Sequence, residues 1–117
     1  MEKERYMGAF DRFWEKGNLL KKTIVIDNTF YEKLNELAKT KYQTSTNQLI
    51  NGCIEELLRT KKINVYVRPK GEISEQRSLL IREELFEGLE QMRDKYHLSI
   101  YKLVNIAIKN ALEEIEK

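Results

Sequence analysis

The sequence is poor in the residue types on which enzymes and secreted domains depend. It has one cysteine, Cys53, and one histidine, His97, so it offers no pair of cysteines for an intrachain disulfide and no cluster with metal-ligand spacing. Glycine is scarce, at five residues, and no glycine-rich phosphate-binding motif is present. These absences predict that the protein is not an enzyme and that it uses no cofactor and no metal ion.

Proline and long apolar runs are scarce as well. The only proline is Pro69, and no apolar run reaches the roughly 18 residues that suggest a membrane span. Glu2 and Glu4 precede only a few apolar residues, which is not typical of a secretory signal. Together with the lone cysteine, these features predict a cytoplasmic protein with no membrane partner.

The remaining composition suits one small ordered domain. The 117 residues are 41% hydrophobic and 34% charged, which allows a single core in a largely helical fold. The net charge is only +2, so charge alone does not predict a nucleic-acid partner. Any contact with DNA has to come from where individual side chains are placed.

The most informative feature is an internal repeat. Residues 22–37 align with residues 77–92, and residues 45–58 align with residues 99–112 after a one-residue deletion in the second copy. Two unrelated amphipathic helices would also align tolerably, but they would not share the short strand before each helix pair. The repeat therefore predicts a duplicated unit. Equivalent positions in the two copies include Lys22 and Arg77, Thr23 and Ser78, Tyr31 and Phe86, and Asn51 and Asn105.

Each copy predicts a strand followed by two helices. In the first copy, residues 20–26 are rich in β-branched side chains, Asp27 follows as a helix N-cap, and apolar residues recur at helical spacing from residue 28 to about residue 42. Ser45, with Gln48 three residues later, is typical of a capping box at the start of a second helix. That helix is expected to end near residue 61.

The second copy repeats this pattern with different capping residues. Residues 76–81 are expected to form the strand, and Glu83 and Glu84 suit the positive end of the next helix dipole. Ser99 caps a closing helix over residues 100–114. Neither copy alone buries enough apolar surface or pairs its strand, so the two copies are expected to pack together.

Two segments lie outside the repeat. Residues 1–19 carry aromatic residues at helical spacing and predict an amphipathic extension, which either packs on the core or docks a protein partner. Residues 62–75 form a linker in which residues 63–68 alternate, so this stretch is either an extra strand or an extended tether. The predicted organisation is therefore residues 1–19, 20–61, 62–75 and 76–117.

The two copies share a short alternating strand, a leucine-bearing helix and a serine-capped second helix. These features are carried by Thr23, Ile24, Val25, Ile26, Leu34, Leu37, Ala38, Ser45, Leu49 and Ile50, and by Ser78, Leu79, Leu80, Ile81, Leu89, Leu98, Ser99, Leu103 and Val104. In them the chain resembles the ribbon-helix-helix (MetJ/Arc) superfamily of DNA-binding proteins, and the tandem arrangement is similar to that of TraY-type accessory proteins of conjugative plasmids. The resemblance implies a mostly α-helical fold with a short β ribbon, in which two ribbon-helix-helix units fused in one chain form an intramolecular pseudo-dimer.

Strand alternation identifies candidate base-reading residues for a ribbon lying in the major groove of double-stranded DNA. If Ile24, Ile26, Leu79 and Ile81 face the core, their neighbours face outward. Lysine donates to guanine, glutamine pairs with adenine, hydroxyls serve either, and aliphatic groups pack on thymine methyls. Alternatively, protein covers both faces of the ribbon. The candidates are Lys21, Thr23, Val25, Gln76, Ser78 and Leu80.

The N-termini of the second helices are candidates for binding DNA phosphates, because their free N–H groups carry partial positive charge. The serines in these turns also serve as ordinary caps. The two reading strands differ in sequence, which predicts an asymmetric DNA site. The candidate phosphate-binding residues are Ser45, Thr46 and Asn47 in the first copy, and Ser99, Ile100 and Tyr101 in the second.

Several biological roles are compatible with this interpretation. A transcriptional repressor, a relaxosome accessory protein of conjugation, and a partition or antitoxin protein would all bind DNA in this way, and a higher-order assembly on DNA stays open. The alternative from a different class is a helical protein-protein interaction module that does not bind DNA. It explains the apolar stripes of the helices but gives no reason for the strand before each helix pair.

Overall fold

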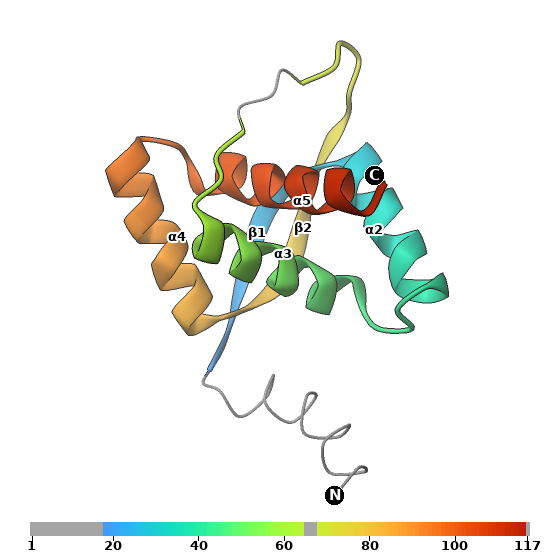
Figure 1. Ribbon diagram of the computed structural model, residues 1–117, viewed down its shortest axis with the longest axis horizontal. Helices are drawn as coiled ribbons and strands as arrows, with labels where there is room; N and C mark the ends of the chain where they lie inside the picture. The colour runs from blue at the N-terminus through green and yellow to red at the C-terminus, as the bar shows by residue number, and fades with distance from the viewer. Residues whose placement is uncertain (1–17, 65–67, 117) are drawn as a thin grey trace, which may run out of the picture.

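Two strands and four helices make up the described part of the chain, in an order that runs strand, helix, helix and then repeats (Figure 1). The computed structural model describes residues 18–64 and 68–116. Every strand and helix predicted within these residues is present, with bounds that differ by a few residues at most. The elements are β1 (Leu19–Asp27), α2 (Asn28–Thr40), α3 (Thr46–Thr60), β2 (Ser74–Arg82), α4 (Glu83–Tyr96) and α5 (Ile100–Glu116).

The two strands pair with each other to form a two-stranded antiparallel sheet, which we call the ribbon. All nine residues of each strand are in register, from Leu19 opposite Arg82 to Asp27 opposite Ser74. Thr23 lies directly opposite Ser78, at the middle of the ribbon. The expectation that the second strand returns antiparallel to the first is therefore confirmed.

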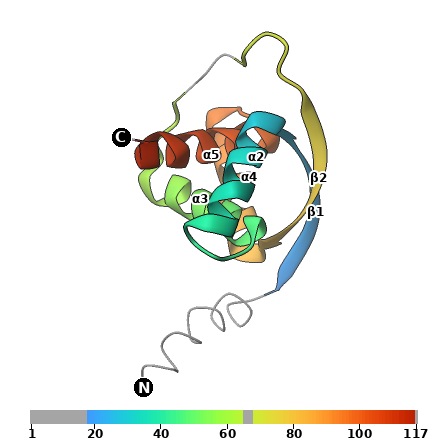
Figure 2. The ribbon, with the colours of Figure 1, turned by 90° about the vertical axis from the view of Figure 1, so that its right-hand side faces the viewer.

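The four helices pack on one face of the ribbon, and the strands curve around them (Figure 2). Alternate strand residues point into this helical layer, where Ile24, Ile26, Leu79 and Ile81 are at most 5% exposed. The core continues through α3 and α5, which pack against each other in the centre of the molecule. The predicted inward-facing strand residues are therefore confirmed, and the described residues form one core.

The start of α2 differs from the sequence-based expectation. Asp27 occupies the N-cap position, but its side chain makes no capping hydrogen bond. Its buried carboxylate instead accepts a 2.6 Å hydrogen bond from the Ser74 hydroxyl and lies 3.4 Å from the Nε atom of Arg68. The capping role passes to Glu72, whose carboxylate accepts from the backbone N–H of Thr29 at 3.0 Å and from its hydroxyl at 2.8 Å. Because Asp27 pairs with Ser74 across the ribbon, its carboxylate turns toward the second strand.

The segments outside the repeat are described only in part. The predicted amphipathic helix lies mostly in residues 1–17, outside the described residues, and so do residues 65–67 of the predicted extra strand. The flanking linker residues are not in a strand, and Asn110 of α5 anchors them through hydrogen bonds to Asn64 at 3.1 Å and to the carbonyl of Lys62 at 2.7 Å. None of the helices in residues 18–64 and 68–116 has the length and hydropathy that a membrane span requires.

Candidate nucleic-acid interface

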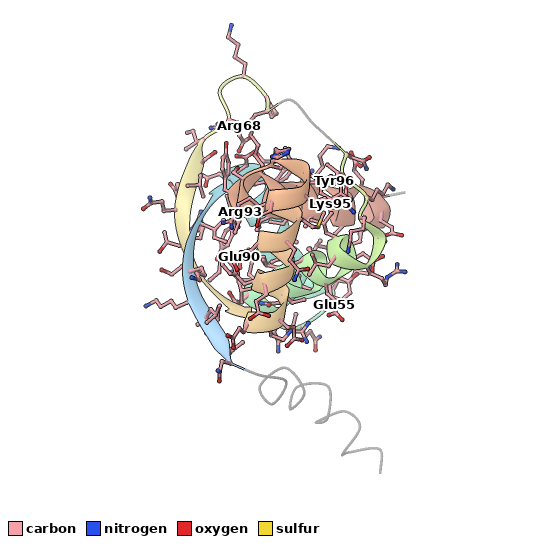
Figure 3. All side chains as sticks on the ribbon, turned by 90° about the vertical axis from the view of Figure 1, so that its left-hand side faces the viewer. Glu55, Arg68, Glu90, Arg93, Lys95 and Tyr96 are labelled. Carbon is pink, nitrogen blue, oxygen red and sulfur yellow. The ribbon has the colours of Figure 1, made fainter. Side chains whose placement is uncertain are left out.

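The six candidate base-reading residues lie together on the face of the ribbon that points away from the helices. Figure 3 shows side chains projecting from this face. Five of the six are exposed, and Val25 is half-buried. The observed register sets them directly opposite one another in three pairs, which are Lys21 with Leu80, Thr23 with Ser78, and Val25 with Gln76.

This outer face has two chemically different ends and a neutral centre. Thr23 and Ser78 place two hydroxyl groups at the centre, and Lys21 carries the only formal charge among the six side chains. Leu80 is 38% exposed, so it presents an aliphatic surface on this face. Strand residues two apart are separated by about 6.7 Å, so the three pairs span roughly 13 Å. That length corresponds to about four base-pair steps of 3.4 Å.

The two edges of the ribbon are occupied by buried asparagine side chains. On the β2 edge, the Asn51 amide donates to the carbonyl of Leu80 at 2.8 Å, and its oxygen accepts from the N–H of Arg82 at 3.0 Å. On the β1 edge, the Asn105 amide donates to the carbonyl of Val25 at 3.0 Å. An unpaired strand edge is a template for aggregation, and these amides satisfy part of each edge within the chain.

Asn105 on the β1 edge makes the same set of hydrogen bonds as Asn51 on the β2 edge. The Asn105 oxygen accepts from the N–H of Asp27 at 3.1 Å, as Asn51 accepts from Arg82. Each amide also donates to a carbonyl one turn earlier in its own helix, at 2.8 Å to Tyr101 and 2.9 Å to Asn47. We did not predict this edge role, although an equivalent asparagine inside both apolar stripes was a signal for it.

The candidate phosphate-binding turns flank the ribbon on opposite sides. The N-terminus of α3 lies beside the β2 edge, where Asn47 exchanges two hydrogen bonds with the backbone of Leu80 at 2.7 and 3.0 Å. The N-terminus of α5 lies beside the β1 edge, because Asn105 joins the Tyr101 carbonyl to Val25. The first-turn N–H groups of a helix lack partners within that helix, so each terminus offers donors next to the ribbon.

The candidate residues in these turns do not all behave as predicted. Ser45 and Ser99 are caps, since their hydroxyl oxygens accept from the N–H of Gln48 at 3.0 Å and of Lys102 at 3.3 Å. The Thr46 hydroxyl donates to Asn35 at 2.8 Å, and the Asn47 amide is bonded to the ribbon. Ser45, Ser99 and Tyr101 are exposed, and Thr46, Asn47 and Ile100 are half-buried. At both termini it is therefore the backbone N–H groups of the first turn, at residues 46 and 47 and at residues 100 and 101, that the helix orients for an anion.

Two cations that we did not predict are held against aromatic rings beside the ribbon. The Lys22 ammonium lies 4.6 Å from the centre of the Phe86 ring, and the Arg77 guanidinium lies 4.0 Å from the centre of the Tyr31 ring. Arg77 also donates to the side chain of Asn28 at 3.2 Å. The cation and the ring occupy equivalent positions in the two copies, and each pair joins one copy to the other. A cation–π contact holds the cation over the ring and contributes a modest stabilisation.

The described residues at this surface are not arranged to bind a metal ion, and they do not include a reactive thiol. Across the part of the chain that the structure describes, no group of three or more His, Cys, Asp and Glu side chains is placed to hold a metal ion. Cys53 is buried in the core, and burial raises the pKa of its thiol to about 12. The candidate interface therefore consists of strand side chains, helix N-termini and aromatic-bound cations. Comparisons of the chain with protein-family models, curated proteins and solved structures find no significant match.

Proposed function

We propose that this protein binds double-stranded DNA sequence-specifically, with the outer face of the ribbon in the major groove. One observation carries the proposal: Lys21, Thr23, Val25, Gln76, Ser78 and Leu80 line one face of a ribbon whose other face packs on four helices. A two-stranded ribbon fits the roughly 12 Å width of the major groove, where every base pair presents a distinct pattern of donors and acceptors. The role is that of a transcriptional regulator or of an accessory factor in plasmid transfer.

The chemistry of the outer face supports readout of bases. Lysine and glutamine are side chains that discriminate guanine and adenine, and the two central hydroxyls adapt to either base. The aliphatic groups of Val25 and Leu80 gain a partner in the thymine methyl, which gives a reason for their position on the outer face.

Phosphate contacts on both sides of the groove complete the proposed binding mode. The N-termini of α3 and α5 flank the two edges of the ribbon and carry the partial positive charge that suits a phosphate. Lys22 and Arg77 lie on the inner side of the ribbon and carry positive charges close by, although Arg77 is also ion-paired with Glu75 at 3.1 Å. With a net charge of only +2, the proposed binding relies on where donors and cations lie around the ribbon and not on the charge of the whole molecule.

We further propose that the two copies act as an intramolecular pseudo-dimer. Equivalent residues make equivalent contacts, as in Asn51 with Leu80 and Asn105 with Val25. Thr23 and Ser78, which are equivalent in the repeat, face each other at the middle of the ribbon, as an axis of approximate two-fold symmetry requires. A single chain then supplies both strands, so DNA binding should not depend on dimerisation of the protein.

A fluorescence-anisotropy titration against a randomised duplex pool, followed by selection of bound sequences, tests the proposal. We expect binding that weakens steeply with salt, because neutralised phosphates release counterions. Lys21→Ala and Gln76→Ala should each weaken binding to the selected site by about 1 to 3 kcal/mol. Lys39→Ala, which removes an exposed lysine from α2, is the matched control and should change specific binding little.

Two results would contradict the proposal. Absence of salt-sensitive binding at micromolar protein would favour a helical protein-interaction module. Loss of affinity by an equal factor on all sequences in the Lys21→Ala and Gln76→Ala variants would show that these side chains do not read bases. In both cases the thermal unfolding of each variant should be measured first, since these exposed substitutions are expected to leave the fold intact.

A further inference from the structure

We infer that the two ends of the ribbon read different base pairs, with guanine beside thymine at one end of the DNA site and adenine beside thymine at the other. The inference rests on the proposed function, because it assigns the bases that the same outer face contacts. We call the two opposed residues Lys21 and Leu80 the lysine end, and the two opposed residues Gln76 and Val25 the glutamine end. Thr23 and Ser78 separate them.

The cross-strand register makes each end a pair of one polar and one aliphatic side chain. Directly opposed residues have Cβ atoms about 5 Å apart, so both side chains of an end reach the same or adjacent base pairs. The sequence alone does not determine this pairing. A register shifted by two residues would place Lys21 opposite Ser78 instead and would mix the two kinds of end.

The polar residue of each end selects a different purine. The Lys21 ammonium has three donors and no acceptor, which matches the two acceptors of guanine, O6 and N7. The Gln76 amide has a donor and an acceptor, which matches the N7 acceptor and N6 donor of adenine. The opposed aliphatic side chains, Leu80 and Val25, each favour a thymine methyl nearby.

The backbone is also held differently at the two ends. At the lysine end, Leu80 is bonded by both Asn47 and Asn51, through three hydrogen bonds of 2.7, 2.8 and 3.0 Å. At the glutamine end, Val25 accepts a hydrogen bond from Asn105, and the position equivalent to Asn47 is Tyr101, whose side chain carries no amide. The two ends therefore differ both in their outward side chains and in the hydrogen bonds that hold their backbone. Both differences favour one orientation of the protein on its site.

Sequence selection with two symmetrised variants tests this inference. Val25→Leu combined with Gln76→Lys gives both ends a lysine and a leucine, and we expect the selected site to become a palindrome of the guanine-containing half. Lys21→Gln combined with Leu80→Val gives both ends a glutamine and a valine, and the selected site should become a palindrome of the adenine-containing half. The unmodified protein should bind its own site roughly 10- to 100-fold more tightly than either palindrome.

The outcomes separate this inference from the proposed function. If the unmodified protein selects no sequence, the proposed function fails. If it selects a palindrome, or if both symmetrised variants keep the original site, the assignment of bases to the two ends is wrong while specific binding stands. A third variant, Lys39→Ala, removes an exposed lysine from α2 and serves as the control that should keep the original asymmetric site. Circular-dichroism melting of all three variants checks that each is folded.

Discussion

At the scale of single residues, Cys53 illustrates how burial alone sets the chemistry of a side chain. The thiol lies in the core on α3, where the charged thiolate would lose the hydration that water provides. Desolvation raises its pKa from 9.0 to about 12, although a backbone hydrogen bond opposes part of the shift. At neutral pH the residue is a small apolar group that happens to contain sulfur.

The raised pKa predicts a specific pH dependence of stability. The folded protein holds the thiol proton more tightly than the unfolded chain, so this contribution is fully present below pH 9 and is lost as the pH rises toward about 12. The free energy of unfolding by urea should therefore fall over this window more steeply in the unmodified protein than in Cys53→Ala. Native Cys53 should also react slowly with a thiol reagent and quickly once urea unfolds the chain. A rapid reaction in the native state would contradict the buried position.

At the scale of elements, the ribbon depends on side chains from helices far away in the sequence. A two-stranded sheet alone is marginally stable in water. Here the helices cover one face, and Asn51 and Asn105 supply hydrogen bonds to the two edges. A buried amide that lost its partners would be costly, so these residues stabilise only the paired arrangement.

Asn105→Ala tests this dependence. The substitution leaves the Asp27 N–H and the Val25 carbonyl without their side-chain partner, which should lower the free energy of unfolding by about 1 to 3 kcal/mol or more. Hydrogen exchange at the Asp27 amide should accelerate in the variant. Gln91→Ala, which removes an exposed amide from α4, is the control and should change stability by less than about 0.5 kcal/mol. Equal stabilities of the two variants would show that the edge bonds contribute little.

At the scale of the whole molecule, the two copies share one core and are expected to unfold together. Leu34 in α2 and Ile108 in α5 come from different copies, and both are at most 2% exposed within the same cluster. Leu34→Ala or Ile108→Ala should each lower the free energy of unfolding by about 2 to 5 kcal/mol through a core cavity. Urea denaturation followed by circular dichroism should show one transition in both variants. Two separate transitions would indicate that each copy folds alone.

The net charge of the whole molecule bears on the proposed DNA binding. The net charge of +2 is too small to attract DNA by itself, so the proposed binding depends on cations that the fold brings together. Lys22 and Arg77 are 55 positions apart in the sequence and flank the same ribbon through contacts with Phe86 and Tyr31. The composition therefore gave no direct sign of this local charge.

The sequence by itself determined the order of elements, the faces of the strands and the composition of the core. Alternation with period two and apolar spacing near 3.6 residues are local properties, and they predicted Ile24, Ile81, Leu34 and Ile108 as inward-facing residues. The inner and outer strand faces followed from the same pattern. The six candidate base-reading residues lie on the outer face as predicted, because alternation leaves them no other side.

The tertiary structure alone decided which residues meet across long separations. Capping of α2 by Glu72 in place of Asp27, the amide bonds of Asn105 to the β1 edge, and the pairing of Lys21 with Leu80 join residues that are more than 40 positions apart. The local preferences of a sequence do not predict such contacts, because they depend on how the second copy packs against the first. The register that results from this return decides which side chains stand together on the outer face of the ribbon.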